Sequence, residues 1–454
     1  MTLMAGISGV RGIVGESMTP EVAADLGRAF GAHAAGGTVV VGRDSRPGGP
    51  ALQRALADGL LAAGCDVIDL DVVSTPGVAL MVSRLAAAGG VVVTASHNPA
   101  EWNGVKFLSS RGCAPSPEEA RAILDRFHAR RRVDAPCGRS PQRVARGDRP
   151  TERTDSSAAE AHVAAVLAHV RTTPIVARRF RIVLDSVNGA GGAEGRRLLE
   201  ALGCTVEHLN AEPTGRFAHP PEPLAENLSC LCDAVRRAGA DAGFAQDPDA
   251  DRLAIVDDTG RYIGEEYTLA LSARRRFERN PGPAAANLST SRMIDDLAAR
   301  AGGPCRVFRT PVGEAHVAAA VVRHGCVIGG EGNGGVILPG VVLVRDSLAA
   351  MGLVLELLAA ERRTLTQIVD SMPRYAMIKR KIKADRPQID AWLVRLRRDF
   401  SGERLDDSDG LRIDWPAGWV HVRPSNTEPI ARLIAEAADE PTAVHLAHRT
   451  QSLL

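Results

Sequence analysis

A serine at the end of a predicted strand is the first residue in this chain that could do chemistry. Ser96 follows the apolar run at 91–93, which predicts a buried strand, and residues 97–99 (His-Asn-Pro) predict that the strand ends in a turn. Strand ends are where α/β proteins build their sites, so this hydroxyl can act as a nucleophile or carry a phosphate. The alternative is a serine that only caps the turn or a helix.

Three aspartates at alternate positions form the second chemical signal. Asp247, Asp249 and Asp251 lie between the apolar runs at 242–245 and 253–256, which predicts strand–loop–strand. Alternation places three carboxylates on one side of a tight loop, where they would repel one another unless a cation sat among them. Hard oxygen ligands suit Mg²⁺. The alternative is a solvated acidic turn, whereas an EF-hand would need a longer loop between helices.

A third segment, near the C-terminus, has the chemistry of a phosphate cradle. Arg423 offers a planar, bidentate donor, and Ser425, Asn426 and Thr427 add short polar side chains and backbone N–H groups. The alternative is a capped helix start, because Ser425 and the glutamate three positions later fit the Ser-x-x-Glu capping box. The two interpretations are compatible, since helix N-termini bind phosphate.

Two glycine-rich segments and one lysine add binding groups. Five glycines surround Glu331 in the segment 329–335, which a ligand can approach closely, and Glu331 could accept hydrogen bonds from sugar hydroxyls. This segment lacks the Gly-Lys-Ser/Thr of a Walker A loop. Near the N-terminus, three glycines flank Arg11, whose charge suits a phosphate, although any flexible loop could begin this way. Lys106 is a second cation close in sequence to the serine, and residues 43–46 (Arg-Asp-Ser-Arg) predict a structural ion network near the same loops.

The elements that would position these groups recur along the chain. Three times a helix-like segment ends in Gly-Cys and runs directly into a short apolar strand, at 64–65, 203–204 and 325–326. An apolar strand also precedes each copy, at 39–41, 182–184 and 307–308. Each unit therefore predicts β-α-β with a right-handed crossover and mostly parallel pairing, although glycine is common in such loops without any true repeat.

Changes in composition divide the chain into four predicted domains, 1–157, 158–259, 260–372 and 373–454. The first three are predicted as related α/β units, and the last, with a strand-like run at 430–437, as a smaller α+β unit. Residues 130–157 are rich in Arg, Pro, Ser and Asp, which favours a solvated linker over a nucleic-acid patch.

Bulk composition excludes several classes of protein. The 454 residues are 45% hydrophobic and 24% charged, with a formal net charge of +1 and 4% aromatics, so no broad attraction to nucleic acid or to a membrane is expected. The eight cysteines form no CxxC pair, and the chain has neither a signal segment nor an apolar run long enough to cross a membrane. We therefore expect a cytoplasmic protein with reduced thiols. A monomer or a homodimer is expected, and the sequence does not choose between them.

The five segments, in this order and spacing, resemble the phosphohexomutase superfamily, which includes phosphoglucomutases, phosphomannomutases and phosphoglucosamine mutases. The resemblance covers the whole chain. It implies three related α/β/α mixed-sheet units around a central cleft, followed by a smaller C-terminal α+β domain. It also implies an isomerase that moves phosphate within a sugar, through a phosphoserine and a bisphosphorylated intermediate.

The resemblance gives each candidate residue a role. Catalysis would fall to Ser96, the phosphoserine, with Arg11, His97 and Lys106 around the transferring phosphoryl group. Mg²⁺ would be held by an oxygen on Ser96 together with Asp247, Asp249 and Asp251. Substrate binding would use Arg252 beside the metal loop, Glu331 and Asn333 at the sugar, and Arg423, Ser425, Asn426 and Thr427 at the non-reacting phosphate.

The implied substrate is a hexose or hexosamine phosphate, and glucosamine-6-phosphate converted to glucosamine-1-phosphate is the first choice. Mg²⁺ is the implied cofactor, and a hexose or hexosamine 1,6-bisphosphate the implied activator. Three alternatives stay open. The chain could be a phosphomannomutase or phosphoglucomutase acting on unaminated hexoses, a sugar phosphatase or bisphosphate synthase on the same scaffold, or a non-catalytic sugar-phosphate-binding protein.

Some residues depart from the family pattern. Ile7 stands where threonine is common, and Pro248 and Ala250 stand where glycines are common in the metal loop, which removes no ligand. The Glu-Gly-Asn-Gly-Gly form of the sugar segment and residues 264–268 favour a phosphoglucosamine-mutase-type branch. Asn426, in contrast, is shared with members of the phosphomannomutase/phosphoglucomutase type.

A further departure concerns the general base. The sugar segment ends in Asn-Gly-Gly at 333–335, where many members have Ser-Gly-His. The usual candidate histidine is therefore missing, and Lys106 and Arg11 are the leading candidates in its place.

Overall fold

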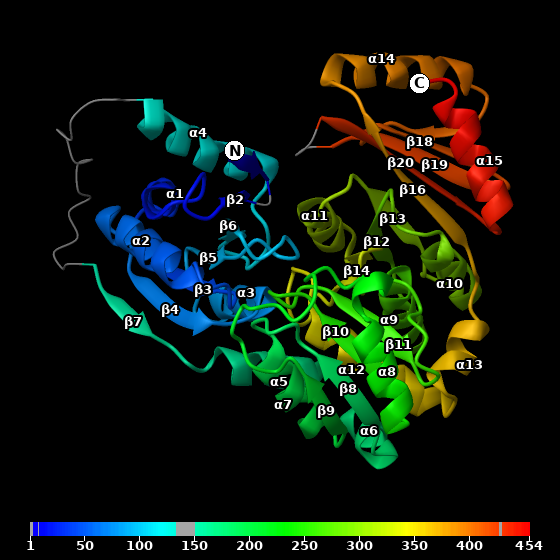
Figure 1. The fold of residues 1–454 in the computed structure, drawn as a ribbon, viewed down its shortest axis with the longest axis horizontal. Coiled ribbons are helices and arrows are strands. Elements are labelled where there is room, and N and C mark those ends of the chain that lie inside the picture. The colour runs from blue at the N-terminus through cyan, green and yellow to red at the C-terminus, as the bar shows by residue number, and fades with distance from the viewer. Residues whose placement is uncertain (1–2, 8, 133–149, 426–428) are drawn as a thin grey trace.

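The computed structural model describes residues 3–7, 9–132, 150–425 and 429–454. We call the predicted ranges 1–157, 158–259, 260–372 and 373–454 domains I to IV. Figure 1 shows that they follow an arc, from domain I in blue, through domains II and III in green and yellow, to domain IV in orange and red. The predicted class, three related α/β units followed by a smaller α+β unit, is confirmed.

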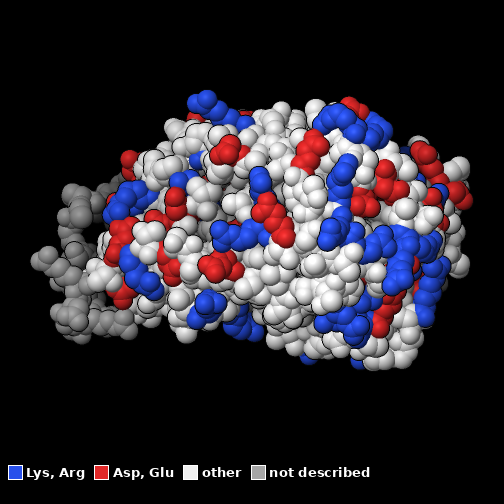
Figure 2. Space-filling model, turned by 90° about the horizontal axis from the view of Figure 1, so that it is seen from below, with Lys and Arg blue, Asp and Glu red and all other residues white. Residues whose placement is uncertain are grey.

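The outside of the molecule carries charges of both signs. On the face in Figure 2, acidic and basic side chains are interspersed. This distribution fits the formal net charge of +1. Among the residues that the structure describes, no helix is both long enough and apolar enough to cross a membrane.

Domain I is a mixed sheet with helices on both faces. Its described strands run in the order β1-β2-β6-β5-β3-β4-β7, antiparallel from β1 to β5 and parallel from β5 to β7. Strand β5 is buried throughout, which confirms the buried strand predicted before Ser96. Helices α1, α2 and α4 pack on one face, and α3 packs on the other. The elements are β1 (Met4–Gly6), β2 (Gly9–Ile13), α1 (Pro20–His33), β3 (Val39–Arg43), α2 (Gly49–Ala62), β4 (Val67–Val72), α3 (Thr75–Arg84), β5 (Gly89–Val93), β6 (Trp102–Ser109), α4 (Pro117–Arg132) and β7 (Glu152–Thr154).

Domain II repeats the β-α-β unit that the second Gly-Cys pair predicts. Strand β8 pairs in parallel with β9 and β10, and β11 adds an antiparallel edge, in the order β11-β10-β8-β9. The elements are α5 (Ala158–His169), α6 (Thr172–Arg178), β8 (Arg181–Asp185), α7 (Gly192–Ala201), β9 (Thr205–Leu209), the 3₁₀ turn η1 (Ala225–Asn227), α8 (Ser229–Ala238), β10 (Ala242–Gln246) and β11 (Leu253–Asp257).

Domain III has the same plan, with sheet order β13-β12-β14-β15 and an antiparallel edge at β15. Gly64, Gly203 and Gly325 all take positive φ at a helix end, so the three repeats use glycine for the same backbone reason. The elements are α9 (Glu266–Arg279), β12 (Ala284–Asn287), α10 (Met293–Ala301), β13 (Val307–Thr310), α11 (Glu314–His324), β14 (Ile328–Glu331), β15 (Gly335–Ile337), α12 (Ser347–Glu361) and α13 (Leu365–Asp370).

Domain IV is an antiparallel sheet in the order β16-β20-β19-β18-β17, with α14 and α15 packed on it. Its core is separate from the core that domains I, II and III share. The shared core centres on α12, which is apolar on all sides and therefore buried between neighbours on α5, α6 and α9. The elements of domain IV are β16 (Ala376–Lys383), α14 (Arg386–Asp399), β17 (Arg404–Asp406), β18 (Leu411–Trp415), β19 (Gly418–Pro424), β20 (Ile430–Ala437) and α15 (Glu440–Gln451).

Two segments interpreted as glycine-rich loops are hairpins. Strands β1 and β2 pair with each other, and β2 also pairs with β6, so Arg11 lies on a strand. In the segment 329–335, the first three residues end β14 and Gly335 begins β15, which leaves only a short turn between them. The glycines permit close strand contacts in both places.

Two other predictions concern connections. Residues 130–132 end helix α4, and Glu152–Thr154 add β7 to the domain I sheet, so the linker predicted over 130–157 is wrong at both of its ends; residues 133–149 lie outside the described part. Strands β19 and β20 pair antiparallel, and Ser425 N donates to Ile430 O. The capping-box interpretation needs the glutamate at position 428, and residues 426–428 lie outside the described residues, so it stays a prediction.

One fully buried histidine lies where the first three domains meet. His162 on α5 has Nδ1 3.0 Å from Glu194 and Nε2 3.0 Å from Asp346. Burial opposes the charge, but Asp346 and Glu194 outweigh it and raise the pKa of His162 to about 10. The folded chain therefore binds this proton more tightly than the unfolded chain does.

This proton gives a prediction for stability against pH. Because the pKa of His162 is raised from 6.5 to about 10, its contribution is complete below pH 6.5 and is lost as the pH rises toward 10. We expect the free energy of unfolding to fall by about 3 kcal/mol or more across that window. Urea unfolding at several pH values measures this change, and a curve for His162→Gln that falls as steeply as the wild-type curve would contradict the assignment.

Candidate active site

Ser96 lies in a strained turn that Arg46 holds in place. The residue has φ 53°, which non-glycine residues rarely adopt, and its side chain is fully buried. Its N–H donates to Thr94 Oγ1 at 2.8 Å. The buried guanidinium of Arg46 donates to the carbonyl oxygens of Ser96 and Asn98 at 2.6 Å each and pairs with Asp44. The predicted ion network around Arg46 is therefore confirmed, and it supports the serine loop directly.

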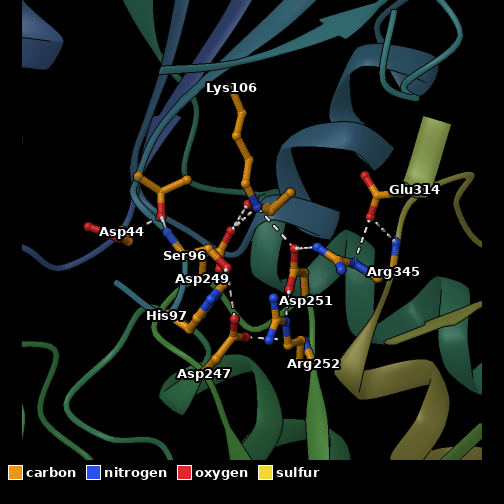
Figure 3. Close-up of polar contacts among 12 residues, drawn as sticks. Asp44, Ser96, His97, Lys106, Asp247, Asp249, Asp251, Arg252, Glu314 and Arg345 are labelled. Atoms are coloured by element: carbon orange, nitrogen blue, oxygen red, sulfur yellow. Dashed lines mark hydrogen bonds and ion pairs between the residues drawn. The ribbon is translucent and has the colours of Figure 1, made fainter. Parts of the chain in front are cut away.

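The hydroxyl of Ser96 points at the triple-aspartate loop (Figure 3). Its Oγ donates to Asp247 Oδ2 at 3.1 Å and lies 3.4 Å from His97 Nδ1. The positive charge of Arg252 and burial of the ring hold the pKa of His97 well below its ordinary value, so the ring is neutral at pH 7. The other ring nitrogen, Nε2, lies 3.8 Å from Glu222 Oε1.

The three aspartates meet at one point in space. One carboxylate oxygen from each of Asp247, Asp249 and Asp251 lies within 4.8 Å of the others, and all three side chains are fully buried. The predicted strand–loop–strand is the β10–β11 hairpin, and Ala250 closes its turn with φ 56°. Oδ1 of Asp249 and Oδ1 of Asp251 are buried without a hydrogen-bond partner. Unpartnered hard oxygen donors in a buried cluster fit Mg²⁺.

Charge is distributed unevenly among these carboxylates. Burial, together with the nearby Asp251 and Asp249, raises the pKa of Asp247 well above its ordinary value. Burial acts in the same direction on Asp251, but Arg345 and Lys106 outweigh it and hold the pKa of Asp251 well below its ordinary value. The protein's positive charges therefore compensate Asp247 less than they compensate Asp251.

Lys106 bridges two of the aspartates and is charged. Its Nζ lies 2.5 Å from Asp249 Oδ2 and 3.0 Å from Asp251 Oδ2. Burial would lower the pKa of Lys106, but the two carboxylates outweigh it and raise that pKa. Arg11 donates to Asn98 Oδ1 at 2.9 Å, and a guanidinium does not lose its proton in proteins. In this arrangement both predicted candidates for the general base are hydrogen-bond donors.

Arg345 joins the metal loop, residues 247–251, to the hairpin of β14 and β15, which we call the sugar hairpin. Sequence analysis missed this arginine. Its Nη2 donates to Asp251 Oδ2 at 2.6 Å, and its Nη1 donates to Glu331 Oε2 at 2.8 Å. Its Nε donates to Glu314 Oε2 at 3.0 Å. The Asp-Ser pair that follows Arg345 precedes a long apolar run, a pattern that predicts a helix N-terminus. This pattern could have drawn attention to Arg345.

Sequence analysis also missed two residues that contact the site, Thr75 beside Asp249 and Glu222 beside His97. Thr75 N donates to Asp249 O at 2.9 Å, and Thr75 Oγ1 donates to Asp249 Oδ2 at 2.6 Å. Its Ser-Thr-Pro-Gly setting predicts a helix start, which is a usable signal. Glu222 comes from an irregular loop of domain II and carries no such signal.

The sugar hairpin presents buried polar atoms. Glu331 accepts hydrogen bonds from Asn287 Nδ2 at 2.8 Å and from Gly313 N at 3.2 Å. Asn333 Oδ1 is buried and has no hydrogen-bond partner. Arg252, beside the metal loop, donates from its backbone N to Asp247 Oδ1 at 3.1 Å. Arg345 links Glu331 to Asp251, and Arg252 contacts Asp247 directly, so both Glu331 and Arg252 belong to the network that includes Ser96.

Arg423 lies apart from this network, on β19 of domain IV. Its Nε donates to Asp409 Oδ2 at 2.9 Å, and Val312 N of domain III donates to the same oxygen at 3.0 Å. Asp409 therefore orients Arg423 and ties it to domain III. Of the other predicted phosphate ligands, Ser425 is described, whereas Asn426 and Thr427 lie outside the described residues.

The sequence matches known protein-family models over most of its length. Residues 2–133, 160–260 and 265–375 match the models described as phosphoglucomutase/phosphomannomutase, alpha/beta/alpha domains I, II and III. Residues 376–452 match the phosphoglucomutase/phosphomannomutase C-terminal domain. Together they account for all four units of the fold.

Individual proteins agree with these matches. The chain is 39% identical to a probable phosphoglucosamine mutase of Methanopyrus kandleri, over 97% of this chain and 95% of that protein. It is 38% identical to a phosphoglucomutase/phosphomannomutase of Thermococcus kodakarensis, over 98% and 96%. The crystal structure of a phosphoglucomutase/phosphomannomutase family protein from Burkholderia thailandensis superposes with a TM-score of 0.85 at 27% identity, over 100% and 98% of the two chains. The chain therefore belongs to the phosphoglucomutase/phosphomannomutase family of phosphohexomutases, which are isomerases.

Proposed function

We propose that this enzyme interconverts the 6-phospho and 1-phospho forms of a hexosamine, with glucosamine-6-phosphate and glucosamine-1-phosphate as the preferred pair. The observation that carries the reaction type is the contact of Ser96 Oγ with Asp247 Oδ2 at 3.1 Å inside a buried three-carboxylate cluster. The hexosamine is supported by similarity to proteins named probable phosphoglucosamine mutase, among them one from Pyrococcus abyssi at 34% identity. A hexose such as glucose or mannose phosphate is the second candidate, supported by the 38% identical relative from Thermococcus.

Ser96 would carry the phosphoryl group. In the first half-reaction the bond from Ser96 Oγ to phosphorus breaks and a bond from phosphorus to a sugar hydroxyl oxygen forms. The hydroxyl loses one proton, and Ser96 Oγ ends with one proton, so no net charge is created. The second half-reaction reverses these changes at the other phosphate, after the bisphosphate has turned end for end.

The residues around Ser96 are suited to this transfer. Asp247, Asp249 and Asp251 would hold Mg²⁺, which would neutralise charge on the transferring group. The cations Lys106 and Arg11, with His97, would donate to phosphoryl oxygens from outside the metal loop.

The remaining predicted residues would hold the rest of the substrate. Glu331 and Asn333 would contact sugar hydroxyls, and Arg252 would line the cleft beside the metal loop. Arg423, with Ser425, Asn426 and Thr427, would grip the phosphate that is not reacting. A hexosamine 1,6-bisphosphate would act both as the intermediate and as the activator that phosphorylates Ser96.

Removing the guanidinium of Arg423 tests the distant phosphate site. We expect Arg423→Ala to raise KM for the sugar phosphate by about 10- to 100-fold, because charge-assisted hydrogen bonds contribute about 1.5–3 kcal/mol. kcat should change less, since the contact is made in the ground state as well as the transition state. Steady-state kinetics measure both, with exposed Arg404→Ala on the same domain as the control. An unchanged KM would remove Arg423 from the substrate site.

The proposed function is tested by comparing kcat/KM for glucosamine-6-phosphate, glucose-1-phosphate and mannose-1-phosphate, with the matching bisphosphate as activator. We expect the hexosamine to give the highest value. Free phosphate is measured in the same reactions. Release of phosphate in place of isomerised sugar would establish a phosphatase, and no conversion of any of the three would overturn the mutase.

A further inference from the structure

A chain of buried polar groups runs beneath the metal loop and links three domains. Ser74, the N-cap of α3 in domain I, donates from Oγ to Glu194 Oε2 at 2.6 Å and from N to Glu194 Oε1 at 3.3 Å. Glu194 is on α7 of domain II and also faces His162. His162 faces Asp346 on its other side, and Asp346 is the N-cap of α12 in domain III. All four residues are buried.

His162 must donate on both sides of its ring. Glu194 Oε2 and Asp346 Oδ2 are carboxylate oxygens at 3.0 Å from Nδ1 and Nε2, and an ionised carboxylate only accepts hydrogen bonds. A singly protonated ring could satisfy one carboxylate and would face the other with a lone pair. The arrangement therefore needs an imidazolium, which places one positive charge between two negative ones.

The two helices that this chain anchors also hold the metal loop. The residue after the first cap, Thr75, donates from N and from Oγ1 to Asp249. The residue after the second cap, Ser347, donates from N to Ala250 O at 3.2 Å. The loop of domain II is thus held by helix N-termini from domains I and III, and Glu194 and His162 connect the caps of these two helices.

We infer that His162 is a positioning residue for the metal site, acting through Ser74 and Asp346 on the backbone of the aspartate loop. The side-chain contacts of His162 are with Glu194 and Asp346, and not with Asp247, Asp249 or Asp251. This inference rests on the proposed function only in that the three aspartates bind Mg²⁺. Groups that orient metal ligands from a distance typically change metal affinity by about 10- to 100-fold when removed.

Two substitutions of His162 each keep only one of its two hydrogen bonds, to Glu194 or to Asp346. A third substitution, elsewhere on α5, controls for loss of stability. His162→Asn keeps an amide near Nδ1 and thus only the bond to Glu194, whereas His162→Gln reaches toward Asp346 and keeps only that bond. Val166→Ala, one turn along α5 and fully buried, removes packing without touching the bridge. Mg²⁺ affinity of each purified full-length protein is measured by isothermal titration calorimetry, alongside its thermal stability.

We expect both His162 variants to bind Mg²⁺ about 10-fold or more weakly, and Val166→Ala to bind as the wild type does although it is less stable. Wild-type affinity in the His162 variants, or equal weakening in Val166→Ala, would overturn the inference. If wild-type protein binds no Mg²⁺, it is the proposed metal site that fails. Should the His162 variants not fold, Glu194→Gln, which keeps an acceptor for Ser74, is measured in their place, and unchanged affinity there also overturns the inference.

Discussion

Replacing Ser96 with alanine is expected to abolish mutase activity, with a loss of at least about 10⁴-fold in kcat. The hydroxyl is the proposed carrier of the phosphoryl group, so its removal takes away the reaction path and not only an interaction. The fold should tolerate the change, because the Ser96 backbone N–H and carbonyl, which bond to Thr94 and Arg46, remain in place.

The measurement combines kinetics with intact mass. Wild-type protein incubated with a hexose bisphosphate should gain the mass of one phosphoryl group, and Ser96→Ala should gain none. Ser83→Ala, an exposed serine of the same domain, serves as the control and should behave as the wild type does. A Ser96→Ala protein that still takes up the phosphoryl group would place the carrier elsewhere.

Replacing Asp247 with asparagine is expected to lower kcat by about 10³-fold while making the metal-free protein more stable. One oxygen from each of the three buried carboxylates lies within 4.8 Å of the others, and protein cations compensate Asp247 less than Asp251. Asparagine keeps the shape of the side chain and removes one negative charge from this repulsion, so the melting temperature of the metal-free protein should rise.

The second half of this expectation concerns metal-dependent stability. Mg²⁺ should raise the melting temperature of the wild type, because a ligand that binds only the folded state stabilises it. Asp247→Asn should lose most of that increase. Asp258→Asn, near the far end of β11, is the matched control and should keep it. A full Mg²⁺ response in Asp247→Asn would exclude Asp247 as a ligand.

The groups that sequence analysis found are those with local patterns. Ser96 and the aspartates stand at the ends of short apolar runs, and the fold places them where such strands end. Arg345 was missed because its contact with Asp251 joins residues 94 positions apart, and nothing in its own neighbourhood announces the partner. His162 was missed for the same reason, since its partners lie 32 and 184 positions away.

The errors have a physical origin as well. Glycines at 6–12 and 329–335 suggested loops, but the pairing of β2 with β6 and of β14 with β12 and β15 overrode the local preference. After Arg423 the chain returns antiparallel along β19 as β20, which the polar residues of that segment do not announce. Local propensity decides such segments only where no neighbouring strand offers its hydrogen bonds.

The separate core of domain IV bears on how the protein opens. One apolar cluster runs from Val40 to Met372 and holds domains I, II and III together, whereas domain IV relies on its own cluster between Leu396 and Ala447. Local opening proceeds along boundaries between cooperative units, so we expect domain IV to move as a body more readily than the other three domains. Such a movement would release the phosphate held at Arg423 and give a bound sugar bisphosphate room to turn. Ser96 and the aspartate loop would meanwhile stay within the larger core, whose amide protons we expect to exchange last.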